Sequence, residues 1–210
     1  MTIKLIINAD DFGSSAVFNE KILDLLDKGY IKSTTVLVNR VAEGQQDQIR
    51  RLIELYQNKK ISVGLHLEFD DAKPLLPQIE SQYQKFISIF GFKPTHLDVH
   101  KSHPNALETI NKFAEKDNLP VRNLGVKSKT KQTTAYRLIA KKSDLNEWMG
   151  FIREMKDNNS YEPVTHPGDY YPNSKSTLNK ERKTEYDNIC KLHEFLKSRK
   201  DIELISYKQL

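Results

Sequence analysis

The feature that most constrains the fold of this 210-residue chain is a regular alternation of apolar, strand-like runs with helix-like stripes. The apolar runs predict seven strands, at residues 3–9, 34–39, 61–67, 95–100, 120–126, 162–166 and 202–207. Between most of these runs, apolar side chains recur at helical spacing, as they do at Phe18, Ile22 and Leu25. This alternation is typical of a parallel sheet with helical crossovers. Seven strands in a chain of this length fit either a doubly wound sheet or a short, incomplete barrel.

The length and composition indicate a globular protein with one substantial core, so we expect a single domain over residues 1–210. Residues 125–143 are rich in lysine and threonine and predict a mobile loop. The sequence has no apolar stretch near the ~20 residues of a membrane helix, and its start does not resemble a signal peptide. The single cysteine, Cys190, excludes an internal disulfide framework. We therefore expect a reducing compartment, the cytoplasm.

The net charge of +5 and the pI of about 9.1 raise the question of a nucleic-acid partner. The lysines are spread along the chain, however, and most stand beside acidic residues on predicted helix faces. No helix-turn-helix signature or aromatic platform accompanies them. A solvated surface is therefore the better interpretation, and we expect neither nucleic acid nor membrane as a partner.

Two predicted strands carry polar side chains on one face. The sequence HLDVH at 96–100 places two histidines and an aspartate on the same face, because side chains alternate along a strand with a period of two. In the preceding strand, Gly64, His66 and Glu68 share a face in the same way. An exposed edge strand or a hydrogen-bonded core histidine would explain either pattern taken alone.

Ionisable side chains stand at the C-terminal ends of four predicted strands: Asp10 and Asp11, His66, the HLDVH group, and His166. In a parallel α/β fold these ends lie on one side, which holds the active site in barrels. Each group alone could be a helix cap or a turn. Four such coincidences favour a site, because burying ionisable groups together is costly unless they are paired or bind a metal.

Two histidines and one carboxylate with open coordination positions describe a catalytic metal centre for zinc or non-haem iron. Such a metal lowers the pKa of its bound water to ~7 and polarises a carbonyl oxygen. A further carboxylate and a further histidine could act as general base and general acid, each contributing about 10²–10⁴ in rate. The residues therefore predict metal-assisted hydrolysis of an unnamed substrate.

The sequences NADDFG, VGLHLEF, THLDVHKSH and VTHPGDY, in this order, resemble the YdjC-like carbohydrate deacetylases. That family includes chitooligosaccharide deacetylases and is distantly similar to NodB-type polysaccharide deacetylases. The resemblance extends from residue 3 to about residue 170. It implies a seven-stranded, incomplete TIM-like (β/α) barrel of the polysaccharide-deacetylase type. The implied reaction removes the acetyl group from N-acetylated amino sugars or chitooligosaccharides.

Carried over position by position, the resemblance implies one divalent metal ion, magnesium or zinc, bound by Asp11, His66 and His100. It implies that Asp10 is the general base that acts on the attacking water. It implies that His166 is the general acid that protonates the departing amine.

The resemblance also implies supporting roles. Asp98 would hold a metal-binding histidine in the right tautomer by hydrogen bonding, and His96 would lie deeper on the same strand face. Four aromatic residues are candidates for stacking on the sugar: Phe12, Phe69, Tyr170 and Tyr171. Ser102 stands where a histidine is common in the family. Relatives are often dimers, so a homodimer is implied.

Two other functions remain open. One is another metal-dependent barrel enzyme acting on sugars, such as an isomerase or a phosphoesterase. The other is a non-catalytic sugar-binding or regulatory relative. The paired aspartates together with HPG favour the deacetylase, and a mere scaffold needs neither an acid nor a base.

Overall fold

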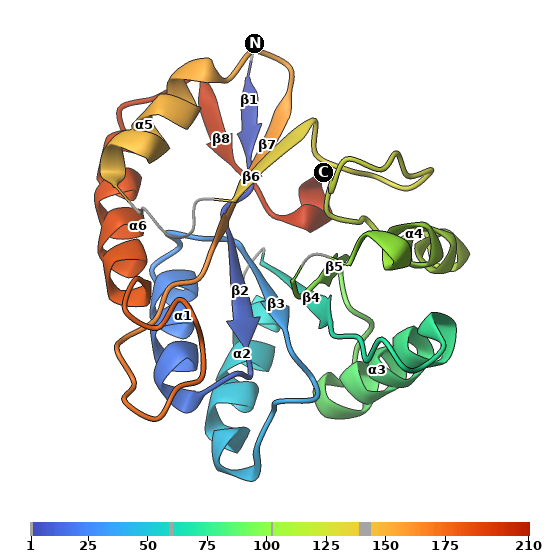
Figure 1. Cartoon of the computed structure of the whole chain (residues 1–210). Helices are drawn as coiled ribbons and strands as arrows, with labels where there is room; N and C mark the ends of the chain where they lie inside the picture. The colour runs from blue at the N-terminus through green and yellow to red at the C-terminus, as the bar shows by residue number, and fades with distance from the viewer. Residues whose placement is uncertain (1, 59–60, 102, 139–143) are drawn as a thin grey trace.

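The computed structural model describes residues 2–58, 61–101, 103–138 and 144–210. The strands are β1 (Ile3–Leu5), β2 (Asn8–Phe12), β3 (Ser33–Val36), β4 (Ser62–Leu67), β5 (Leu97–Val99), β6 (Ala135–Leu138), β7 (Ser160–Thr165) and β8 (Ile202–Leu204). The helices are α1 (Ala16–Asp27), α2 (Gln46–Asn58), α3 (Leu75–Phe90), α4 (Leu107–Lys116), α5 (Leu145–Glu154) and α6 (Arg182–Leu196). Three 3-10 turns are described, at Glu43–Gln45, Pro104–Ala106 and Tyr207–Gln209. The helices lie outside the strands (Figure 1).

The strands pair in parallel and form an irregular ring. The order runs β5-β4-β3-β2-β7, with β6 on the other side of β7, and β1 pairs with both β7 and β8. Between β5 and β6 the ring is joined at Val121, which bridges to Leu97 and whose amide donates to the Lys131 carbonyl at 3.1 Å. With β1 and β2 counted as one interrupted strand, the described residues form seven strands. The incomplete barrel is confirmed, and the doubly wound sheet is excluded.

Two local predictions are wrong. Residues 120–126 do not form a strand beyond the bridge at Val121. Gly125 there has φ of +85°, and the Asn123 side chain donates a hydrogen bond to the Thr133 carbonyl. This segment therefore forms a turn instead of the hydrogen-bonded ladder of a strand. The strand β6 lies within the segment predicted as a loop, where Thr133 and Thr134 precede it. Residues 139–143 of that segment lie outside the described residues.

Two helix ends carry the residues that commonly cap helices. The Ser15 hydroxyl caps α1 by accepting a hydrogen bond from the Phe18 amide at 3.2 Å. Helix α3 ends at Gly91, whose φ of 76° suits glycine. The apolar faces of α1, α2, α3 and α4 pack with apolar strand residues such as Val63 and Leu65 in one continuous core. The barrel interior carries polar side chains instead, so the core lies between wall and helices.

The floor of the barrel is closed by aromatic stacking. The His96 ring stacks on the Tyr207 ring with centroids 3.8 Å apart and an interplanar angle of 10°. Both side chains are buried. Gly64 lies directly against His96: a Cβ at this position would stand 2.5 Å from Nε2 and 2.7 Å from Nδ1 of the imidazole. The glycine in the third predicted strand therefore makes room for the histidine of the fourth.

Replacing Gly64 with alanine should destabilise the protein, because neither the His96 ring nor the Tyr207 ring can move aside without repacking the floor. We expect a loss of about 1–3 kcal/mol in the free energy of unfolding. Urea unfolding followed by circular dichroism measures this loss. The matched control is Gly150→Ala in α5, where no described atom lies within 4 Å of the new Cβ. That variant should keep or slightly raise stability, by up to about 1 kcal/mol. Equal effects of the two substitutions would contradict the packing at Gly64.

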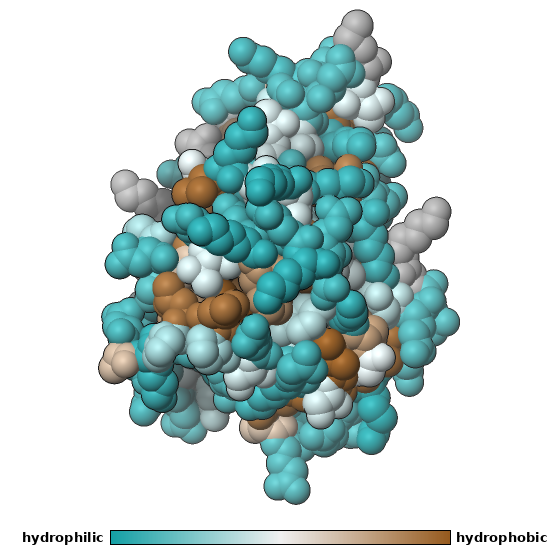
Figure 2. All heavy atoms as spheres, turned by 90° about the vertical axis from the view of Figure 1, so that its right-hand side faces the viewer, coloured by the Kyte–Doolittle hydropathy of each residue, from teal (hydrophilic) through white to brown (hydrophobic). Residues whose placement is uncertain are grey.

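In the parts of the chain that the structure describes, no helix is both long and apolar enough to span a bilayer. The face that carries α3 and α4 is mostly hydrophilic, with apolar residues confined to small patches (Figure 2).

Candidate active site

The site begins with an irregularity in β2. Asp10 and Asp11 are consecutive residues, and regular alternation along a strand would send them to opposite faces. The ladder with β3 pairs Ala9 with Thr34 and Phe12 with Val36, so β2 carries one extra residue between these pairs. Asp11 has φ of 71°, in the left-handed region. This bulge turns both carboxylates toward the barrel interior, and such a backbone costs of order 1–3 kcal/mol.

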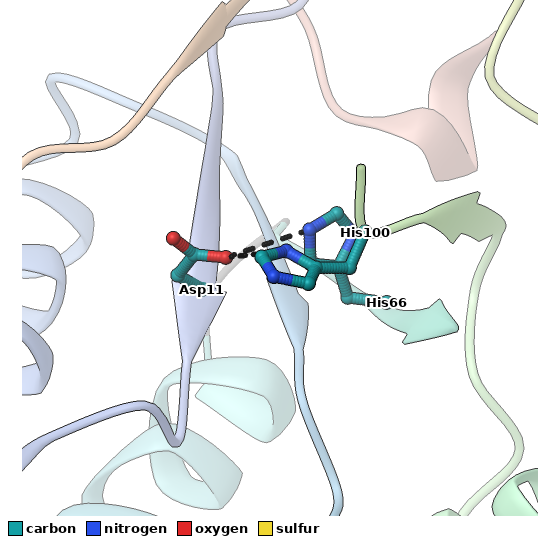
Figure 3. A group of neighbouring side chains, drawn as sticks. All are labelled: Asp11, His66 and His100. Atoms are coloured by element: carbon teal, nitrogen blue, oxygen red, sulfur yellow. Dashed lines mark ion pairs between the residues drawn. The ribbon is translucent and has the colours of Figure 1, made fainter. Parts of the chain in front are cut away.

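Asp11, His66 and His100 converge at the end of the barrel where the strands terminate (Figure 3). Oδ1 of Asp11 lies 3.5 Å from Nε2 of His66 and 3.3 Å from Nδ1 of His100. The side chains come from β2, β4 and the residue after β5. Oδ1 of Asp11 is buried and has no hydrogen-bond partner among the described residues. One carboxylate oxygen and two imidazole nitrogens facing one point fit a divalent cation.

Asp98 orients His66. One of its carboxylate oxygens lies 2.8 Å from Nδ1 of His66, which leaves Nε2 directed at Asp11. Burial by itself lowers the pKa of His66, but the carboxylates, chiefly Asp98 and then Asp10, outweigh it and raise this pKa to about 10. The surroundings of His66 therefore favour positive charge at this point, as a cation site requires.

Arg122 holds the other aspartate. Its two terminal nitrogens donate to both oxygens of Asp10, at 2.8 and 2.7 Å. Its Nε donates to Glu162 at 2.9 Å, and it also pairs with Asp98. Burial alone would raise the pKa of Asp10, but Arg122 and then His66 hold it far below the ordinary 3.8. Asp10 is therefore ionised at neutral pH and fixed in orientation.

Glu162 links this arginine to the floor. The Tyr207 hydroxyl donates to the Glu162 carboxylate on the side away from Arg122. Burial raises the pKa of Glu162 to about 7, although Arg122 and Tyr207 both act to lower it. The position of Arg122 thus depends on residues at the bottom of the barrel.

His166 also lies near Asp10. Its Nε2 is 3.9 Å from Oδ2 of Asp10, and its amide donates to Glu185 at 2.6 Å. Burial lowers the pKa of His166 below 6.5, against the raising effect of Asp11 and Asp10. The imidazole is therefore largely neutral at pH 7 in the free protein.

A cavity of about 1030 Å³ opens onto these groups. Its walls include the segment 173–178, rich in hydroxyl groups, and apolar side chains such as Leu107 and Val126. His103 also lines it, and its Nε2 lies 2.8 Å from Asp71.

The four aromatic candidates lie in different places. Tyr171 lines the cavity. Phe12 is fully buried in the core, because the bulge places it there, so it has no free face for a sugar and its prediction is corrected. Phe69 packs against the core with its ring 5.0 Å from that of His103, and Tyr170 is 54% exposed and outside the cavity lining. His96 lies at the floor, away from the three converging residues, and Ser102 lies outside the described residues.

The sequence interpretation missed three charged residues of the site: Arg122, Glu162 and Arg182. Arg122 and Glu162 stand inside predicted strands, where an ionisable residue among apolar ones was the available signal. Arg182 begins α6, far in sequence from every motif, and only the fold brings it to Asp11.

The fold and the site together define a barrel of the polysaccharide-deacetylase type. A solved structure from Enterococcus faecalis V583, of a protein named for the cleavage of cellobiose-phosphate, superposes with a TM-score of 0.82 at 19% identity, covering 100% of this chain and 99% of that one. The CE4 domain of a multidomain xylanase from the hindgut metagenome of Trinervitermes trinervoides superposes with a TM-score of 0.60 at 11% identity, covering 100% and 89%.

Sequence comparison finds similarity to one protein family and to a carbohydrate deacetylase. Residues 4–81 match the family described as YdjC-like protein. A carbohydrate deacetylase from Clostridium beijerinckii is 26% identical, and the alignment covers 99% of this chain and 100% of the relative. Residues 4–81 are therefore similar to the YdjC-like family, and the chain as a whole is similar to a carbohydrate deacetylase. The alignment spans 254 positions, so the relative carries segments that this shorter chain lacks.

Replacing Arg122 with methionine should be strongly destabilising, because the buried carboxylates of Asp10, Asp98 and Glu162 would lose the guanidinium that all three contact. We expect the free energy of unfolding near pH 7 to fall by about 3–5 kcal/mol. Urea unfolding measures it. The control is Arg51→Met, which removes an exposed pair with Glu20 and should cost about 0–1 kcal/mol.

The same variant should change how the free energy of unfolding depends on pH. In the wild type the pKa of Asp10 is depressed, so its contribution to stability is present above 3.8 and is lost as the pH falls below that value. Without Arg122 the pKa values of the buried carboxylates rise further, so as the pH falls from about 7 to about 5 the variant should gain more stability than the wild type, in which the pKa of Glu162 is already about 7. Parallel pH profiles for variant and wild type would show that Arg122 does not set the charge of this cluster.

Proposed function

We propose that this protein is a metal-dependent carbohydrate deacetylase that hydrolyses the acetamide of an N-acetylated amino sugar or chitooligosaccharide. The observation that carries the proposal is the convergence of Asp11, His66 and His100 in one cavity, with Asp10 and His166 flanking them. The carbohydrate deacetylase from Clostridium beijerinckii, matched over its full length, supports the reaction class.

Asp11, His66 and His100 would hold the cation. Two imidazole nitrogens favour zinc over magnesium, which prefers oxygen ligands. When bound, a divalent ion acidifies a water molecule and polarises the acetamide carbonyl. Asp98 fixes the tautomer of His66 so that Nε2 offers its lone pair to the ion.

The flanking residues would carry the protons. Asp10, ionised and held by both terminal nitrogens of Arg122, accepts a proton as water attacks the acetamide carbon. His166, whose Nε2 lies 3.9 Å from Oδ2 of Asp10, is neutral in the free protein, so it first takes up a proton and then delivers that proton to the nitrogen as the carbon–nitrogen bond breaks. The products are acetate and the free amino sugar.

The cavity suits a sugar longer than one ring. Its volume of about 1030 Å³ lies at the upper end of the ~300–1,000 Å³ range of small-molecule sites. Ser174, Ser176 and Thr177 supply hydroxyl groups for hydrogen bonding, and Tyr171 supplies an aromatic face. Location in the cytoplasm, a single domain and assembly as a homodimer remain predictions.

Purified protein loaded with Zn²⁺ should release acetate from N,N′-diacetylchitobiose, and a chelator should abolish the release because the attacking water would lose its activation. Enzymatic determination of acetate measures the reaction, and restoring Zn²⁺ after chelation is the control. A protein that binds the metal and releases no acetate from N-acetylated sugars would favour the other metal-dependent barrel enzyme or the non-catalytic relative.

Substitutions should separate the metal ligands from the general base. Asp10→Asn should lower kcat by about 10²–10⁴ while retaining the metal. His66→Ala and His100→Ala should lose the metal itself, because each removes one of three ligands. Metal content after dialysis and kcat are measured together. The control is His193→Ala, which removes a histidine stacked on Tyr30 at 4.1 Å, outside the cavity. Full activity of Asp10→Asn would mean that the base is assigned wrongly.

A further inference from the structure

We propose that Arg182, in the first turn of α6, is a positioning residue that fixes the Asp11 carboxylate so that one oxygen faces the two histidines. The inference rests on the proposed function, since it concerns the same cation site. Neither the sequence motifs nor the family resemblance points to Arg182.

The contact between Arg182 and Asp11 gives the two carboxylate oxygens of Asp11 different partners. Nη2 of Arg182 donates to Oδ2 of Asp11 at 2.5 Å. Oδ1 is left facing His66 and His100, with no hydrogen-bond donor among the described residues. Because the backbone of Asp11 is in the left-handed region, its orientation must be held from outside the strand. Arg182 provides this restraint.

Arg182 is itself locked in place. Its side chain is fully buried, and the guanidinium carbon lies 4.0 Å from the centroid of the Phe18 ring. The same Nη2 donates to the Ser176 hydroxyl at 3.2 Å, and Nη1 donates to the His166 carbonyl at 3.4 Å. A planar fork that makes several directed contacts at once is the geometry at which arginine differs from lysine.

The glycine of HPG makes room for this arginine. A Cβ on Gly168 would stand 3.0 Å from Cδ of Arg182 and 2.9 Å from a ring carbon of Phe18. The Gly168 amide also donates to the Arg182 carbonyl at 3.2 Å. The loop after β7 is therefore shaped around Arg182.

The first turn of α6 also contacts the backbone of His166. Glu185, one turn after Arg182, is buried and accepts a hydrogen bond from the His166 amide at 2.6 Å. One helical turn thus contacts the side chain of Asp11 and the backbone of His166. Asp11 in β2 and His166 after β7 are also linked by the pairing of these two strands.

A positioning role and a purely charge-neutralising role of Arg182 predict opposite changes in the affinity for the metal. A positive charge beside Asp11 repels a cation, so if charge alone mattered, removing it should tighten metal binding. If Arg182 fixes the geometry, removing it should weaken binding by about 10–100-fold, as the loss of a residue that orients a metal ligand commonly does. The sign of the change in Kd therefore separates the two roles.

The experiment measures Co²⁺ binding to the full chain by competition with a chelating dye, together with the Co²⁺ absorption spectrum. Arg182→Met should bind Co²⁺ about 10–100-fold more weakly than the wild type. Arg182→Lys keeps the positive charge but loses the planar guanidinium. Its Kd for Co²⁺ should lie between those of the wild type and Arg182→Met, and its absorption spectrum should be altered. The matched control is Arg199→Met, which removes an Arg–Asp pair beyond the other end of α6 and should leave Kd unchanged.

Co²⁺ binding by Arg182→Met that is as tight as or tighter than that of the wild type would overturn the inference. If Arg182→Met does not fold by circular dichroism, Arg182→Lys decides: an unchanged Kd and spectrum overturn the inference, and a weaker Kd with an altered spectrum supports it. Absence of Co²⁺ binding by the wild type would instead overturn the proposed function. The two failures are therefore distinguishable.

Discussion

The bulge in β2 is the constraint on which the rest of the site depends. A regular strand would point one of two consecutive aspartates into the barrel and the other toward the helices. The extra residue between Ala9 and Phe12, with Asp11 in the left-handed region, brings both into the same cavity. It also sends Phe12 into the core, where its burial offsets part of the backbone strain. One local irregularity thereby gives two consecutive carboxylates different partners in the same cavity, His66 and His100 for Asp11, and Arg122 for Asp10.

The barrel interior is built around charge rather than around apolar packing. Arg122 meets Asp10, Asp98 and Glu162, and Arg182 meets Asp11. Burying such pairs contributes little to stability, since desolvation offsets the attraction between the charges. Their benefit is geometric, because directed, charge-assisted hydrogen bonds hold each carboxylate in one orientation. Stability must then come from the apolar layer between the wall and the helices, which contains Leu65 and Phe86.

Periodicity and strand ends are local signals, so the sequence sufficed for the alternation of strands and helices and for the main candidate residues of the site, whereas the barrel was implied only by the family resemblance. Asp10, Asp11, His66 and His100 follow directly from where apolar runs stop. Residues 120–126 were predicted as a strand because their apolar content hid the turn-forming Asn123 and Gly125. The contacts of Arg122 and Arg182 depend on which strands become neighbours and where α6 begins. Such long-range contacts leave no periodic trace in the sequence.

The closure of the barrel joins segments that are distant along the chain. β1 pairs with β8, and β2 pairs with β7, so loops of more than a hundred residues must close before these ladders exist. Non-local pairing of this kind makes folding slow. His166 and Glu162 belong to β7 or follow it directly, so they reach Asp10 and Arg122 only when the ring shuts. His66 lies in β4 and His100 directly follows the neighbouring strand β5, so their proximity does not depend on this closure, whereas the contacts of His166 and Glu162 form only with it, which makes the completed site a late product of folding.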